Sequence, residues 1–319
     1  MYKSFYGLKE NPFNVNPDPR YLYRTKKIDE ALAGLVYGIQ TRKGFITLTG
    51  EVGTGKTTLL NRLLTSLGTQ RTKTAFLFNS RINTKQFFDL VLAELEIPCS
   101  SDSKSQQLMR LNSWLLERYR SGETVALIVD EAQNLTFPVL EEIRLLTNLE
   151  TSTDKLLQIV LSGQPELEER IKLPELRQLR QRIMLRCQTS PLSKEETAEY
   201  IQERLRIAGT TEQAEPIFSF KAVEAIHLYS SGIPRVINLL CEHSLITGYA
   251  EHMRPIEVEV VEGVAREFQL DDLEPVAPRG SLQPGADVYT SEAFIQNLGE
   301  ALSRFRLSPP ASIPGRGRK

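Results

Sequence analysis

Short apolar runs alternate with helical patterns over the first 190 residues. The runs at 45–49 and 125–130 are rich in aliphatic residues, whereas 29–40 repeats apolar residues at Leu32, Leu35, Val36 and Ile39, the spacing of one buried helix face. Similar patterns predict strands at 74–78 and 157–162 and helices at 56–67, 84–95, 106–119 and 138–147. Strands that alternate with such helices predict an α/β fold, in which helices cover both faces of a mostly parallel sheet.

The pattern changes after Thr189, where four helices follow one another with little strand signal between them. They are predicted at 193–208, 219–230, 234–250 and 258–268. We therefore expect an α/β core over 44–190 and a small α-helical lid domain over 191–270. The first 43 residues, which we assign to the same module, combine a Pro- and aromatic-rich stretch at 2–23, predicted to be an ordered extended loop, with the helix at 29–40.

The last segment, 271–319, is rich in Pro and Gly and predicts a disordered tail. Within it, 291–306 carries Phe294, Leu298, Leu302 and Phe305 along one helical stripe. This short amphipathic helix either docks a partner, packs back on its own domain or frays in solution.

Composition limits the partners and the cellular compartment that we expect for the protein. Lys and Arg total 39 against 40 for Asp and Glu, a balance that predicts no large nucleic-acid-binding field, although a local basic patch is compatible with it. Cys99, Cys187 and Cys241 lie far apart, which suits a reducing compartment better than a zinc site or a disulfide framework. The N-terminus lacks a secretory signal, and no run reaches the roughly 18 apolar residues of a membrane span. We expect a cytoplasmic protein that reaches a membrane only through a partner.

Residues 50–57 form a phosphate-binding loop between a predicted strand and a predicted helix. They follow the pattern GxxxxGK[ST] as Gly50, Glu51, Val52, Gly53, Thr54, Gly55, Lys56 and Thr57. Glycines let such a loop turn its backbone N–H groups toward a β-phosphate, and the helix N-terminus adds a positive dipole end. Lys56 is expected to contact the β- and γ-phosphates, Thr57 to bind Mg²⁺, and Thr58 to touch the α-phosphate. The predicted cofactors are ATP and Mg²⁺.

A second segment, 125–131, places two carboxylates at the end of an apolar strand, as in a Walker B segment. Adjacent residues on a strand diverge, so Asp130 can face the magnesium shell while Glu131 reaches toward the γ-phosphate, where it would orient or deprotonate a water. Without the loop at Gly50, the same residues would describe only a buried strand that runs into an acidic turn. With that loop, the core is predicted to be a P-loop NTPase three-layer sandwich.

Two positions are candidates for a sensor beside the nucleotide, and two arginines are candidates for a role between subunits. At the end of the strand at 157–162, Gln164 is the first choice for a group beside the attacking water and Ser162 the second, the alternative being that both are ordinary loop residues. Arg182 and Arg180 are candidates for an arginine inserted across a subunit boundary, although a solvated basic helix end explains them equally well.

Arg235 stands early in the helix that Pro234 opens in the lid domain. From there it could reach the γ-phosphate and couple lid closure to the nucleotide state. A lone surface arginine is the alternative, but its order after the other motifs favours the sensor role.

Together these segments resemble the AAA+ ATPases of the general secretion pathway protein A family, also called ExeA-type, in the ORC/Cdc6-like branch. The resemblance covers roughly Met1 to Phe268. It rests on FYGL, NPF, PDPRYLY, EAL and YGI before the loop TGEVGTGKTT, and on DEAQNL, IRLLTNLET, SGQPEL, LRQLRQRI and GIPRVIN after it.

The resemblance implies an ATP-dependent homo-oligomer, possibly a ring, that holds its nucleotide between subunits and uses hydrolysis to rearrange a partner complex. Family members from secretion systems continue into a transmembrane helix and a peptidoglycan-binding region. This sequence shows neither after Asp271, which favours a cytosolic version that serves secretion, pilus or exopolysaccharide machinery through a separate membrane or envelope protein.

Two other functions remain open from the sequence. A DNA-associated regulator, similar to transposition or initiator AAA+ proteins, is supported by fold-level analogy and by the basic residues near Arg177 and Arg316, but the near-neutral charge speaks against it. A third possibility is a regulator that uses ATP only to lock an oligomer, without turnover.

Overall fold

The computed structural model describes residues 1–14, 16, 18–68, 71–78, 81–98, 103–210 and 215–270. The predicted tail at 271–319, with its helix at 291–306, lies outside the described residues. Residues 1–279 cluster into one compact unit, and the described part of the chain falls within it.

A five-stranded sheet, parallel at every pairing, forms the centre of the α/β core. Its strands lie in the order β2-β3-β4-β1-β5. They are β1 (Phe45–Thr49), β2 (Thr72–Leu77), β3 (Thr124–Val129), β4 (Leu157–Gly163) and β5 (Ile183–Gln188). The prediction of a mostly parallel sheet is confirmed. Because β4 lies between β1 and β3, the carboxyl ends of these three strands meet at one edge of the sheet.

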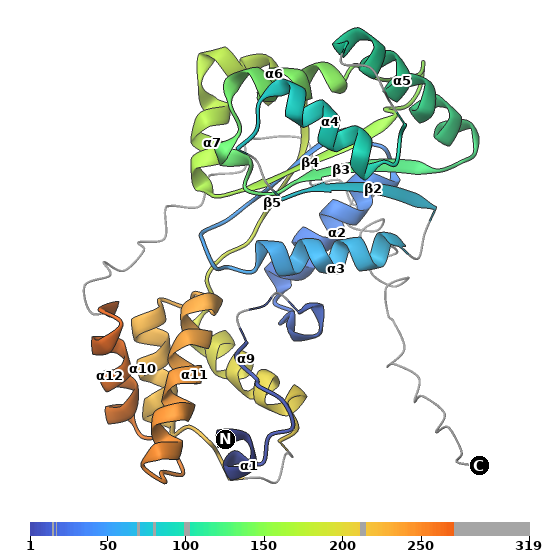
Figure 1. Cartoon of the computed structure of the whole chain (residues 1–319). Helices are drawn as coiled ribbons and strands as arrows, with labels where there is room; N and C mark the ends of the chain where they lie inside the picture. Colours follow the sequence, from blue (N-terminus) through green and yellow to red (C-terminus); the bar gives the residue numbers. More distant parts are fainter. Residues whose placement is uncertain are drawn as a thin grey trace, which may run out of the picture. The chain divides into compact units, whose positions relative to one another are not determined.

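Helices cover both faces of this sheet (Figure 1). One face carries α2 (Lys26–Gln40) and α3 (Lys56–Gly68), and the other carries α4 (Thr84–Glu94), α5 (Lys104–Arg120), α6 (Phe137–Leu146) and α7 (Pro165–Lys172). The short helix α8 (Arg177–Arg180) precedes β5. Single 3-10 turns lie at η1 (Pro19–Tyr21), η2 (Ala132–Asn134) and η3 (Pro174–Leu176).

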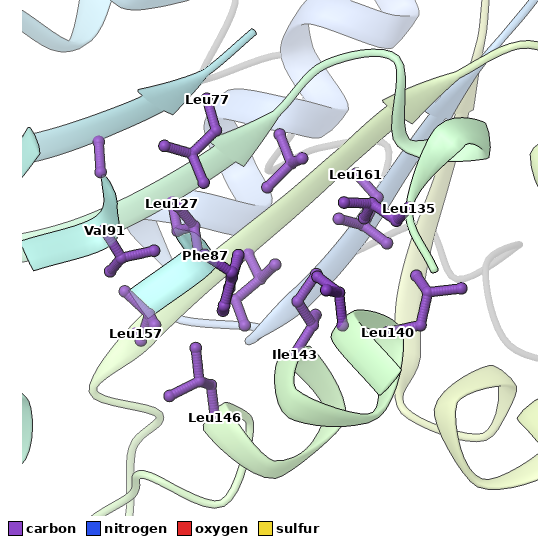
Figure 2. Close-up of a cluster of buried hydrophobic side chains, with 14 of the residues drawn as sticks. Leu77, Phe87, Val91, Leu127, Leu135, Leu140, Ile143, Leu146, Leu157 and Leu161 are labelled. Atoms are coloured by element: carbon purple, nitrogen blue, oxygen red, sulfur yellow. The ribbon is translucent and has the colours of Figure 1, made fainter. Parts of the chain in front are cut away.

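Aliphatic and aromatic side chains fill the space between the sheet and the helices α4 to α7. Phe87, Leu127 and Leu157 are among the buried residues that Figure 2 shows in this cluster, together with Ile143 and Leu161. Complete burial of one such side chain contributes about 1.5–3 kcal/mol. The strand β3 is apolar at nearly every position because both of its faces are covered, and this packing fixes the edge at which Asp130 and Glu131 emerge.

The described residues after β5 form four helices at the predicted places, and we call this region the lid. They are α9 (Lys194–Ile207), α10 (Phe220–Ser230), α11 (Pro234–Ala250) and α12 (Val258–Glu267). A capping box begins α9, in which the Ser193 side chain accepts the Glu196 backbone N–H and the Glu196 side chain accepts that of Ser193. Pro234 opens α11, where its missing N–H leaves no hydrogen bond unmade.

The N-terminal segment differs from the prediction, because it begins with a short helix, α1 (Tyr2–Tyr6), instead of an extended loop. This helix contacts α11, and the Tyr2 hydroxyl donates to the two Glu242 carboxylate oxygens at 2.9 and 2.8 Å. Tyr2, Tyr6 and Phe13 belong to the buried cluster of the lid. The rings of this segment therefore gain their burial from a helix more than 200 residues later in the chain, which local sequence cannot reveal.

Arg204 of α9 fastens this segment to the lid. Its side chain is buried, and its Nε and Nη1 atoms donate to the Pro12 carbonyl and the Tyr200 hydroxyl, both at 2.6 Å. The guanidinium also lies 4.5 Å from the centre of the Tyr21 ring. A cation at this depth is stabilised by the carbonyl, hydroxyl and ring faces around it.

Candidate active site

The loop between β1 and α3 lines a pocket of ≈ 340 Å³ at the carboxyl edge of the sheet. Gly53 and Gly55 have φ angles of 82° and 93°, a left-handed conformation that favours glycine. Lys56 is 6% exposed, and its Nζ donates to the carbonyl oxygens of Gly50 at 2.9 Å and Glu51 at 3.0 Å. Burial lowers the pKa of Lys56, an effect that the charges of Glu131 and Asp130 oppose. The loop thus holds a buried amine that an anion would stabilise in its charged form.

Asp130 lies at the end of β3 beside the first turn of α3. Its Oδ2 accepts a hydrogen bond from the Thr57 hydroxyl at 3.0 Å, and its Oδ1 accepts one from Ser162 at 2.8 Å. Carboxylate and hydroxyl oxygens are ligands that suit Mg²⁺, which usually binds through a few protein oxygens together with phosphates. The pair Thr57 and Asp130 fits the predicted metal position. Ser162, the second choice for the sensor, is fully buried against Asp130 instead of facing the pocket as a free hydroxyl.

Glu131 turns away from Asp130 at the same edge. Its φ of 53° places it in the left-handed region, which sharply redirects the chain after the strand. Its Oε2 accepts hydrogen bonds from Gln133 Nε2 at 2.6 Å and from Gln164 Nε2 at 3.2 Å. The first choice for the sensor, Gln164, therefore contacts the carboxylate that is predicted to orient or deprotonate the attacking water.

Arg235 reaches the phosphate-binding loop from the lid. Its backbone N–H donates to the Gly53 carbonyl at 3.2 Å, and its side chain lines the pocket. The contact is close, since a Cβ added at Gly53 would lie 2.7 Å from the Arg235 Cβ. Five of the predicted positions, Lys56, Thr57, Asp130, Glu131 and Arg235, thus come together although they span 180 residues of sequence.

Two comparisons with known proteins show the family to which this chain belongs. An AAA domain family model matches residues 39–171. General secretion pathway protein A of Aeromonas hydrophila is 45% identical over 251 residues, which cover 78% of this chain and 45% of that protein. The chain belongs to the general secretion pathway protein A family of AAA+ ATPases. It spans less than half the length of that relative.

Solved structures support the fold of this family member. Cdc6p of Pyrobaculum aerophilum has a TM-score of 0.63 at 19% identity, over 80% of this chain and 70% of that one. The ORC2 protein of Aeropyrum pernix, in its ADPNP-ADP complexes, has a TM-score of 0.59 at 16% identity, over 83% and 75% of the two chains. The predicted ORC/Cdc6-like AAA+ fold is confirmed. Among the described residues of this family member, no helix is both long and apolar enough to cross a membrane.

Arg180 and Arg182 lie at the opposite edge of the sheet in this ATPase. They precede β5, whose first residue, Ile183, pairs with Phe45 at the amino end of β1. The five residues of β1 separate this edge from the phosphate-binding loop by roughly 16 Å. The Arg182 Nη1 donates to the Thr147 hydroxyl at 2.6 Å, whereas the Arg180 side chain is exposed. Neither arginine lines the pocket of its own chain.

Sequence reasoning missed much of the pocket of this ATPase. The side opposite the loop is lined by the N-terminal segment and by the lid, including Asn14, Tyr21, Tyr200, Arg204 and Asn238. The resemblance of the Pro- and aromatic-rich stretch to the family was the available signal, but it does not state a role. Gln133 was missed as well, although it lies only two residues after Glu131 in the DEAQNL segment.

Proposed function

We propose that this ATPase binds and hydrolyses Mg-ATP between copies of its own chain, and that hydrolysis drives or regulates assembly of a bacterial envelope complex of the secretion, pilus or exopolysaccharide type. The observation that carries the proposal is the convergence of Lys56, Thr57, Glu131 and Arg235 on one pocket. Asp130 lies behind Thr57, whose hydroxyl donates to it. The name of the Aeromonas hydrophila relative supports the link to secretion.

Within one chain, each residue has a separate task. The loop N–H groups and Lys56 bind the β- and γ-phosphates, and Thr58 touches the α-phosphate. Thr57 and Asp130 would hold magnesium, which neutralises charge on the phosphate oxygens when bound. Glu131 orients the attacking water or accepts its proton.

Two further side chains sense the state of the nucleotide. Gln164 positions the water or the Glu131 carboxylate, to which it already donates. Arg235 contacts the γ-phosphate from the lid, so that loss of this phosphate weakens the contact between lid and loop. Hydrolysis would change the position of the lid through this contact.

The arginines act in trans in this proposal. Their edge of the sheet is remote from the pocket of the same chain, so Arg180 or Arg182 can complete only the site of a neighbouring copy. A guanidinium that enters in this way neutralises charge on the γ-phosphate, and such residues contribute about 10³–10⁵-fold in other P-loop enzymes. The homo-oligomer that the family resemblance implies is consistent with this arrangement.

Phosphate release by the purified protein tests the hydrolysis. We expect Lys56→Ala to lose both ATP binding and turnover, because the loop loses its cation. Glu131→Gln should keep ATP binding and lower turnover by about 10²–10⁴-fold, the usual contribution of a general base. Turnover no greater in wild type than in both variants would leave a protein that binds ATP without hydrolysing it.

A mixing experiment tests the trans arrangement. Lys56→Ala cannot use its own site but carries both arginines, whereas Arg182→Ala has an intact pocket and lacks one of them. If Arg182 acts across the boundary, a mixture of the two inactive variants regains turnover, and the same mixture with Arg180→Ala tests the other candidate. Turnover that stays at the sum of the separate variants contradicts a trans role, and light scattering with and without ATP reports assembly independently.

The last part of the proposal is that the protein binds an envelope partner. We place the protein in the cytoplasm, bound to an unidentified membrane or envelope protein in its ATP state. Glu131→Gln, which would hold ATP, should sediment with membranes of the native host, and Lys56→Ala should not. Equal sedimentation of the two variants would remove the nucleotide-dependent link to the envelope.

A further inference from the structure

Gln133 makes three hydrogen bonds next to the proposed general base. Its Nε2 donates to Glu131 Oε2 at 2.6 Å, and its Oε1 accepts the Gln164 backbone N–H at 3.1 Å. Its backbone carbonyl accepts a hydrogen bond from the Arg170 guanidinium on α7. One side chain therefore bridges the end of β3, which carries Glu131, and the end of β4, which is followed by Gln164.

The surroundings of this glutamine leave it little freedom. A Cβ added at Gly163 would lie 2.8 Å from Gln133 Oε1, so glycine at the end of β4 permits the close approach. Arg170, which holds the turn, lies over the Phe137 ring at 5.2 Å from its centre. Arg170 thus holds the backbone carbonyl of Gln133, and the Gln164 N–H holds its side-chain oxygen.

Glu131 depends on such contacts for its direction. Its left-handed backbone lies outside the preferred regions for a non-glycine residue, so the strand geometry alone does not set where the carboxylate points. Of the two amides on Oε2, Gln133 is the nearer, at 2.6 Å against 3.2 Å for Gln164. The shorter bond therefore has the stronger hold on this oxygen.

We propose that Gln133 is a positioning residue for hydrolysis: it fixes the Glu131 carboxylate for the attacking water, and Arg170 fixes Gln133. The inference rests on the proposed ATP hydrolysis, and Gln133 itself touches no reacting atom. A purely structural role is the competing account, in which Gln133 serves only as acceptor for the Gln164 N–H.

Two substitutions separate these roles because they remove different bonds. Gln133→Glu keeps an acceptor of the same size for the Gln164 N–H but replaces the donor to Glu131 with a carboxylate that repels it, whereas Gln133→Leu loses both bonds without adding charge. A positioning role predicts that both variants lower kcat by roughly 10- to 100-fold, the effect of a misplaced reacting group, with ATP affinity unchanged within about twofold. The matched control is Gln202→Glu, the same change at an exposed position of the lid.

A double substitution gives the decisive readout. When Glu131 is already replaced in Glu131→Gln, adding Gln133→Leu should cause no further loss, because the residue that it positions is gone. Arg170→Met should lower kcat less than Gln133→Leu does, since the amide keeps its two side-chain bonds.

Several outcomes overturn the inference. Wild-type kcat in Gln133→Glu would assign Gln133 a structural role only, and a further loss on top of Glu131→Gln would show that it acts elsewhere. Binding of a fluorescent ATP analogue and far-UV circular dichroism establish that each variant is folded; if Gln133→Leu unfolds, Gln133→Glu decides. Absence of turnover in wild type, at the level of Lys56→Ala, overturns the proposed function as well, so the two failures are distinguishable.

Discussion

Replacing Arg204 tests whether the N-terminal segment is part of the lid. Arg204→Met keeps much of the apolar volume of the side chain and removes its charge and its donors. The Pro12 carbonyl and the Tyr200 hydroxyl then lose their partners at 2.6 Å, and the Tyr21 ring loses the cation at 4.5 Å. We expect the segment to detach from α9 and the lid to lose stability.

The size of the effect follows from these contacts. Two hydrogen bonds from a charged donor are worth roughly 3–6 kcal/mol together, at about 1.5–3 kcal/mol each. Relief from burying the guanidinium offsets part of this sum. We therefore expect Arg204→Met to lower the free energy of unfolding by about 2–4 kcal/mol, and Arg204→Lys, which can reach one acceptor, to lower it by about half as much.

Urea unfolding of the variants measures the loss, and limited trypsin digestion locates it. Cleavage after Lys3 and Lys9 should accelerate in Arg204→Met, and ATP affinity should fall because Asn14 and Tyr21 line the nucleotide pocket. The control is Arg206→Met, whose largely exposed side chain pairs with Glu203 and should matter by less than about 0.5 kcal/mol. An Arg204→Met protein as stable as that control, with the segment equally protected, would refute the reasoning.

Three further predictions concern the loop, the metal and the lid. Gly53→Ala should lower stability and ATP affinity more than Gly55→Ala, because both positions have positive φ but only at Gly53 would a Cβ meet Arg235. Thermal unfolding and ATP titration measure the difference. Equal effects of the two substitutions would contradict the loop–lid contact. Ser162→Ala removes a donor from Asp130, so the Mg²⁺ concentration that half-saturates turnover should rise by roughly tenfold or more, whereas Gln164→Ala should lower kcat without that shift. Burial lowers the pKa of His227, whose Nδ1 lies 2.9 Å from the Thr197 hydroxyl, so the unfolded chain binds its proton first as pH falls. The contribution of this histidine is fully present above its ordinary pKa of about 6.5 and is lost below it, so urea unfolding between pH 7.5 and 5, at roughly half-unit steps, should show a slope that His227→Gln reduces.

The α/β core could be predicted from the sequence because its signals are local. The apolar run of β3 ends at Asp130, and the loop from Gly50 stands between a clear strand and a clear helix, so both motifs were placed correctly at one edge of a parallel sheet. The lid helices could also be predicted, since Ser193 caps the start of α9 and Pro234 suits the first turn of α11.

The remaining parts depend on distant partners. The helix α1 forms where its composition favours a loop, because Tyr2 and Tyr6 are buried against α11. The burial of Arg204 cannot be read from α9, whose sequence shows an arginine at an ordinary helix position. Likewise, the contact of Gln133 with Glu131 requires the left-handed turn at Glu131, for which a glutamate gives no sequence signal.

The attachment of the N-terminal segment to the lid means that the backbone passes between lid and sheet twice. One passage leads from Tyr23 to Lys26 at the start of α2, and the other from Gln188 to Ser193 at the start of α9. A domain joined to its neighbour at two points has fewer possible motions than one joined at a single point. The lid is joined to the sheet at two such points, and η1 contacts α3 of the core beside the first of them. We therefore expect the lid to move in fewer directions, when its contact with the loop at Arg235 changes, than a lid joined at one point would.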